Sequence, residues 1–113
     1  MHEYAVVENI VALAGEQAGN YSAKKVTKIN LVIGELTSIE PEALEMYFEI
    51  LSQGTILEGA ELSFKTIAAE LKCEECGEIF EKKRSVIECP KCRKFGRFTG
   101  KGYEFFMESI EIE

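Results

Sequence analysis

Four cysteines in two Cys-x-x-Cys pairs place the strongest constraint on how this chain can fold. The pairs are Cys73-Glu74-Glu75-Cys76 and Cys89-Pro90-Lys91-Cys92, and twelve residues separate them. The spacing is close to that of a zinc ribbon, in which each pair turns tightly enough to place both sulfurs on one metal ion at about 2.3 Å. Gly77 after the first pair and Pro90 inside the second pair suit such turns. The cysteines therefore predict one shared metal site.

The chemistry of four thiolates favours a structural role for this site. Four thiolates complete a tetrahedral shell and leave no open position for water or substrate, so a bound zinc ion would be structural. Rubredoxin-like iron and a redox-active dithiol pair remain open as alternatives. A zinc hydrolase is disfavoured, because every predicted zinc ligand is a thiolate and no base is placed nearby.

The sequence shows neither a signal peptide nor an apolar stretch of about eighteen residues that could span a membrane. We therefore expect a cytoplasmic protein without a membrane partner, whose cysteines are metal thiolates and not disulfides. All twenty acidic residues are Glu, and His2 is the only histidine. These are few of the groups used for acid-base or triad catalysis, so we expect that the protein is not an enzyme.

Charge is unevenly distributed along the chain, whose formal net charge is -7. Residues 72–101 hold nine Lys or Arg against five Glu, whereas the remainder holds four against fifteen. The segments Lys82-Lys83-Arg84 and Arg93-Lys94-Phe95-Gly96-Arg97 are basic with interleaved aromatics, which raises the hypothesis of a zinc-ribbon nucleic-acid-binding or transcription module. Four thiolates with one Zn(II) would take the whole chain to about -9, a poor match for nucleic acid. An acidic protein partner is the better expectation.

Apolar periodicity outlines the remaining elements. It predicts an amphipathic helix over residues 4–18, a half-buried strand over 26–35, and a second helix that starts at Pro41 and ends at Gly54. A slip in apolar phase over 62–71 predicts one long strand with a bulge or strong twist, and an apolar run over 103–112 predicts a last strand. The expected fold class is α/β (α+β). Two helices lie on a three-stranded sheet with an inserted zinc-ribbon-like module.

The predicted domains are an α/β body of residues 1–71 plus 103–113 and a zinc-binding module of residues 72–102. A long connecting strand that leaves and re-enters the body would allow domain exchange between two chains, and hence a homodimer.

The opening Met1-His2-Glu3 places a free α-amine, backbone nitrogens and one imidazole within a single chelating reach. Nitrogen-rich chelation of this kind suits square-planar Ni(II) or Cu(II), whereas zinc prefers tetrahedral donors. The Glu3 amide or carboxylate can supply a fourth donor. The alternative is an arbitrary second residue on a frayed terminus.

Taken together in order and spacing, five signals match a known family over the whole chain. They are Met1-His2-Glu3, Ile33-Gly34-Glu35, Pro41-Glu42, Gly54-Thr55 and the two Cys-x-x-Cys pairs. The chain resembles the HypA/HybF hydrogenase nickel-incorporation proteins. That resemblance implies a cytoplasmic nickel metallochaperone that delivers Ni(II) to the large subunit of [NiFe]-hydrogenase together with a GTPase of the same maturation pathway.

The resemblance also assigns metal ligands. It implies nickel on His2 and Glu3 with the amine of Met1, and zinc on Cys73, Cys76, Cys89 and Cys92. Some members of the family have an additional histidine in the zinc loop that can approach the nickel. This chain has none, so further nickel ligands would come from Glu3, backbone or water.

Overall fold

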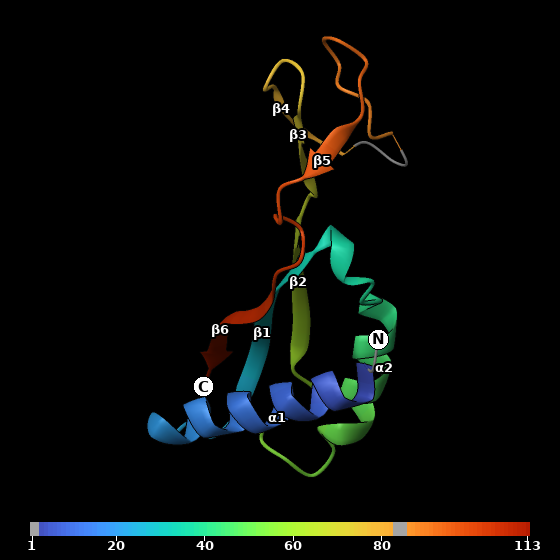
Figure 1. The fold of residues 1–113 in the computed structure, drawn as a ribbon. Coiled ribbons are helices and arrows are strands. Elements are labelled where there is room, and N and C mark those ends of the chain that lie inside the picture. The colour runs from blue at the N-terminus through green and yellow to red at the C-terminus, as the bar shows by residue number, and fades with distance from the viewer. Residues whose placement is uncertain (1–2, 83–85) are drawn as a thin grey trace. The chain divides into compact units, whose positions relative to one another are not determined.

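The computed structural model describes residues 3–82 and 86–113 (Figure 1). Its elements, in chain order, are α1 (Glu3–Asn20), β1 (Val26–Gly34), the short 3-10 helix η1 (Glu35–Thr37), α2 (Pro41–Leu51), β2 (Glu61–Ile67), β3 (Glu70–Cys73), β4 (Ile79–Glu81), β5 (Gly96–Phe98) and β6 (Phe105–Ile112). The predicted class is confirmed, with two α-helices, a three-stranded sheet and a four-cysteine module between its second and third strands. None of the helices in this part of the chain is long and apolar enough to cross a membrane.

The chain divides into two compact units. The first comprises residues 1–32, 38–65 and 106–113, and the second comprises residues 33–37 and 66–105. The predicted module of residues 72–102 falls inside the second unit. The predicted domain boundaries, at residues 71/72 and 102/103, stay a prediction.

The first unit is built on a sheet with the strand order β2-β1-β6. Figure 1 shows β1 and β2 running in the same direction, joined through α2. β6 runs the opposite way, since the N–H of Lys24, just before β1, donates to the Glu113 carbonyl while the N–H of Gly34, at the end of β1, donates to the Glu104 carbonyl. The sheet is therefore mixed, with β1 in its centre.

The amphipathic helix predicted over residues 4–18 is confirmed as α1. Val7, Ile10, Ala14 and Ala18 are buried, at the three- and four-residue spacing that lines one face of a helix. Leu13, another apolar residue of the helix, is 44% exposed. The helix α2 begins at Pro41 as predicted and buries Leu44 and Phe48. The two helices meet through Tyr4 and Tyr47, whose rings lie edge to face with centroids 5.6 Å apart.

The prediction of one long strand over residues 62–71 is wrong. β2 ends at Ile67, β3 begins at Glu70, and the two strands belong to different sheets. Between them, the Ala69 N–H donates to a Glu35 carboxylate oxygen at 2.8 Å and not to a neighbouring strand. The slip in apolar phase thus marks the end of one sheet and the beginning of another.

The second unit contains an antiparallel sheet with the order β4-β3-β5. The central Leu71 pairs with Phe80 on one side and with Phe98 on the other. Next to this sheet, Leu36 donates to the Gly102 carbonyl at 2.7 Å. A Cβ built on Gly34 would overlap that same carbonyl group, and Gly102 itself has a φ of 115°. Backbone segments approach here so closely that only glycine fits at position 34.

We predict that Gly34→Ala destabilises the protein by about 1–3 kcal/mol, because the new methyl group must displace backbone atoms. Urea unfolding of the zinc-loaded protein measures the effect. Gly19→Ala is the matched control, since a Cβ there meets no atom within 4 Å and alanine is favoured in a helix. Equal stability of the Gly34→Ala protein and the unchanged chain would show that the close approach imposes no constraint.

Candidate metal centre

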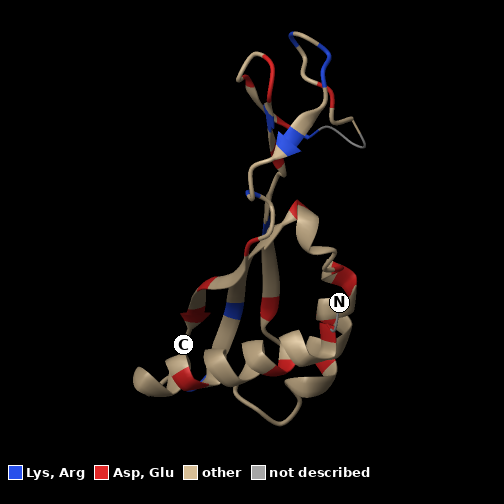
Figure 2. Cartoon of the chain, in the orientation of Figure 1, with Lys and Arg blue, Asp and Glu red and all other residues tan. Residues whose placement is uncertain are grey.

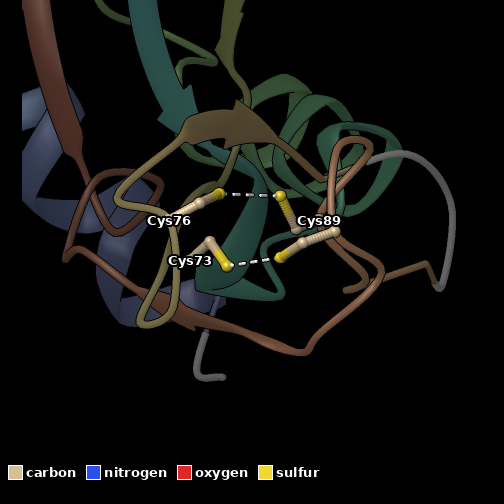
Figure 3. Close-up of side chains that lie close together, drawn as sticks. Cys73, Cys76 and Cys89 are labelled. Carbon is tan, nitrogen blue, oxygen red and sulfur yellow. Dashed lines mark hydrogen bonds between the residues drawn. The ribbon is translucent and has the colours of Figure 1, made fainter.

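The structure brings the four predicted cysteine ligands together. Their sulfur atoms all lie within 4.8 Å of one another (Figure 3). The closest sulfurs join the two motifs, at 3.2 Å between Cys73 and Cys92 and at 3.6 Å between Cys76 and Cys89. All four cysteines are free of disulfides. Sulfurs that are distant in sequence thus surround one position.

The two motifs form turns with the same hydrogen bonds. In the first, Gly77 N–H donates to the Cys73 carbonyl at 2.9 Å, and Cys73 N–H donates to Glu78 at 2.8 Å. In the second, Arg93 N–H donates to the Cys89 carbonyl at 2.9 Å, and Cys89 N–H donates to Lys94 at 2.7 Å. The residue after each second cysteine has a positive φ, 77° at Gly77 and 61° at Arg93. The turn at Gly77 could be expected from its glycine, whereas nothing in the sequence marked Arg93.

Backbone amides and neighbouring sulfurs shift the pKa values of the cysteine thiols in different directions. The hydrogen bond from the Cys76 amide, followed by that from the Cys92 thiol, lowers the pKa of Cys73 to about 7. At Cys92 the Lys94 amide favours the thiolate, but the sulfur of Cys73 and desolvation outweigh it and raise the pKa to about 12. At Cys76 the Glu78 amide also favours the thiolate, and desolvation with the adjacent sulfurs again raises the pKa. Without a bound cation the cluster therefore holds protons on some of its sulfurs.

This donor set fits zinc. Cys73 and Cys89 are buried, Cys92 is intermediate and Cys76 is exposed, so the site lies near the surface with two of its sulfurs enclosed. Four soft sulfur donors provide a complete tetrahedral shell and leave no position for a substrate. The cluster can hold a zinc ion as a structural centre.

The basic segments differ in their surroundings. Lys82 is only 22% exposed at its side chain, and its Nζ lies 3.7 Å from the Glu35 carboxylate, so it belongs to the framework and not to a solvated basic face. Lys83 and Arg84 lie outside the described residues. By contrast, Arg93 and Lys94 are exposed beside Phe95, which is 70% exposed. Figure 2 shows Lys and Arg residues on this part of the chain.

Glu35 was not singled out by its chemistry in the sequence. Its carboxylate accepts the Ala69 N–H and faces Lys82. No local pattern could indicate these partners, because they lie more than thirty residues away in the sequence.

The predicted nickel ligands are only partly within the structure. Met1 and His2 lie outside the described residues. Glu3 is the first residue of α1 and is partly exposed.

Comparison with known proteins identifies the family. The sequence model of the HypA family, described as a hydrogenase/urease nickel-incorporation metallochaperone, matches residues 1–112. The chain belongs to the HypA family. This chain thus belongs to a nickel-incorporation family and holds a cluster of four cysteines able to bind zinc, so nickel and zinc both suit it.

Individual relatives match this chain over nearly all of their own lengths. The hydrogenase maturation factor HypA of Caldanaerobacter subterraneus subsp. tengcongensis is 46% identical, with all of both chains covered. That of Aquifex aeolicus is 35% identical over 100% of this chain and 98% of its own. The solution structure of the nickel metallochaperone HypA from Helicobacter pylori has a TM-score of 0.63 at 27% identity, covering 99% of this chain and 97% of its own.

We predict that Cys73→Ala and Cys92→Ala each lose the zinc ion and unfold the small sheet of the second unit. Zinc content after dialysis against a mild chelator should fall from one per chain to below about a tenth, because the unit has too little core to fold without its metal. Glu75→Ala is the control, because this exposed residue lies in the same turn without being a ligand. If both cysteine variants retained stoichiometric zinc, the four-thiolate centre would be wrong.

Zinc affinity should also increase with pH. The thiols with raised pKa values, Cys76 and Cys92, must release protons before they bind, so protons compete with zinc as the pH falls. We expect affinity to drop by at least about tenfold for each pH unit between about pH 8 and about pH 6. Competition with a chromophoric chelator, corrected for the chelator's own protonation, measures it. An affinity independent of pH would contradict the assignment.

Proposed function

We propose that this protein binds one Ni(II) ion at its N-terminus and delivers it during maturation of [NiFe]-hydrogenase. The observation that carries the proposal is the match of the HypA family model from residue 1 to residue 112, which includes both Met1-His2-Glu3 and the four cysteines. The Helicobacter pylori relative is described as a nickel metallochaperone. A zinc-ribbon nucleic-acid module is not favoured, because the match covers the whole chain and not only the cysteine module.

The proposed nickel site uses the α-amine of Met1, the imidazole of His2 and a donor of Glu3. The amine, the His2 amide nitrogen and the imidazole can close adjacent chelate rings around one ion. A set of nitrogen donors of this kind favours planar Ni(II) over zinc. Glu3 is the first residue of α1, so Met1 and His2 directly precede, in sequence, a helix whose buried face contributes to the core.

Cargo and structural metal use different donors in this proposal. The four thiolates suit zinc and enclose it, whereas the N-terminal donors are suited to an ion that must be released. Release can follow protonation, since imidazole and α-amine have reference pKa values of about 6.5 and about 8. The proposed protein is a carrier and not an enzyme.

The proposed partners are those of the maturation pathway. They are the GTPase that acts in nickel insertion and the large subunit of the hydrogenase, both in the cytoplasm. Exposed Arg93, Lys94 and Phe95 offer an acidic partner a combined charged and aromatic contact in the second unit.

A two-residue Gly-Ser extension before Met1 tests the nickel site without changing a native side chain. We expect most of the nickel affinity to be lost, because the free amine moves away from His2. Zinc content and thermal stability should barely change, since an exposed terminus contributes little to the core. Calorimetric titration with Ni(II) in a buffer that does not bind metal gives the affinity.

His2→Ala should have a similar effect by removing the imidazole. Combining it with the extension should cost little more than either change alone, because the donors of one chelate act as a unit. Asn9→Ala is a matched control on the exposed face of α1 and should leave nickel binding unchanged. Equal nickel affinity for the native and extended chains would show that the Met1 amine is not a nickel ligand.

A further inference from the structure

An acidic groove in the first unit plays no part in either metal site. It has a volume of about 580 Å³ and lies between α2 and the start of β2. Six of the side chains that line it are Glu45, Phe48, Glu49, Glu58, Glu61 and Leu62. We propose that this groove docks a cationic, amphipathic segment of a protein partner.

Apolar side chains form the floor of the groove and continue beside it. Phe48 and Leu62 line the groove and are 4% and 9% exposed. Outside the groove, Met46 and Ile50 of α2 are 53% and 57% exposed and stand four residues apart, so they are neighbours on the helix surface. A partner can cover this apolar surface and remove it from water.

The rim of the groove carries four carboxylates, those of Glu45, Glu49, Glu58 and Glu61. In residues 3–82 and 86–113, none of the four is paired with a Lys or Arg. Glu58 accepts only a weak hydrogen bond from the Gly54 N–H at 3.3 Å. Figure 2 shows acidic residues along α2. Cationic side chains from a partner would relieve the repulsion between these carboxylates.

A metal ion is a poor occupant for this groove. Within the described ranges, the cysteine cluster is the group of donors that lie close enough together to hold a metal ion, and the groove carboxylates do not form one. Carboxylates spread around an apolar floor fit an extended ligand with several separated positive charges. A peptide segment with Lys or Arg on one side and apolar residues on the other has that chemistry.

The partner segment proposed for the groove is cationic, whereas a partner that binds Arg93 and Lys94 would be acidic. The proposal concerns only the first unit and does not depend on nickel at the N-terminus.

The test uses the zinc-loaded full chain without nickel and a capped 14-residue peptide of leucine and lysine, with leucines at helical spacing. Titration calorimetry at low salt gives the affinity, and amide shifts in nuclear magnetic resonance spectra locate the site. We expect the shifts to concentrate in α2 and residues 58–62. A second peptide with serine in place of leucine should bind at least about tenfold more weakly, because it cannot cover the apolar floor.

The charge-reversed variant Glu49→Lys/Glu58→Lys should reduce affinity for the leucine peptide by about tenfold. The matched control is Glu8→Lys/Glu16→Lys on the exposed face of α1, which makes the same change in net charge and should reduce affinity by less than about threefold. Both variants should retain zinc and bind nickel as the native chain does, so failure of the nickel proposal would be seen separately.

Three results would overturn the proposal. Equal weakening by the two variants would show general electrostatic attraction only. Equal binding of the two peptides would show that the apolar floor does not contribute to binding. Amide shifts spread over α1 would show that the peptide binds elsewhere. A milder variant, Glu49→Gln/Glu58→Gln, repeats the test without added positive charge, should any charge reversal disturb the helix.

Discussion

The convergence of four cysteine sulfurs on one position is the interaction on which the second unit depends. Among the described residues of that unit, the buried apolar side chains are Ile33, Ala69, Leu71, Cys73 and Cys89. Two of these five, Cys73 and Cys89, belong to the cysteine cluster that could hold a metal ion, so the candidate metal site and the core share side chains. A unit of this size buries too little apolar surface to offset the chain entropy that it loses on folding. Binding of a zinc ion by the four thiolates would supply the missing free energy.

Apolar packing holds the first unit together. Two helices pack on a mixed sheet, and buried side chains come from α1, α2 and the central strand β1. A body held together by apolar packing could carry the proposed nickel site at its terminus, because binding and release of an ion there would leave the core unchanged. This difference between the units supports the proposal that zinc has a structural role and that nickel is the cargo.

Charge separates the two units further. Arg93 and Lys94 are exposed in the second unit, whereas the four carboxylates of the groove beside α2 belong to the first unit. Surfaces of opposite sign favour different partners, and electrostatic complementarity contributes more to partner choice and association rate than to affinity.

Local sequence patterns were sufficient for the helices, for β1 and for the cysteine cluster. Val7, Ile10 and Ala14 recur at helical spacing, and each Cys-x-x-Cys pair needs only its own turn to present two sulfurs. The division of residues 61–73 between two sheets was decided by tertiary structure, as were the pairing of Lys82 with Glu35 and the groove beside α2. Periodicity reports which side of an element is apolar, but hydrogen bonds and ion pairs between distant segments exist only once the chain has brought them together.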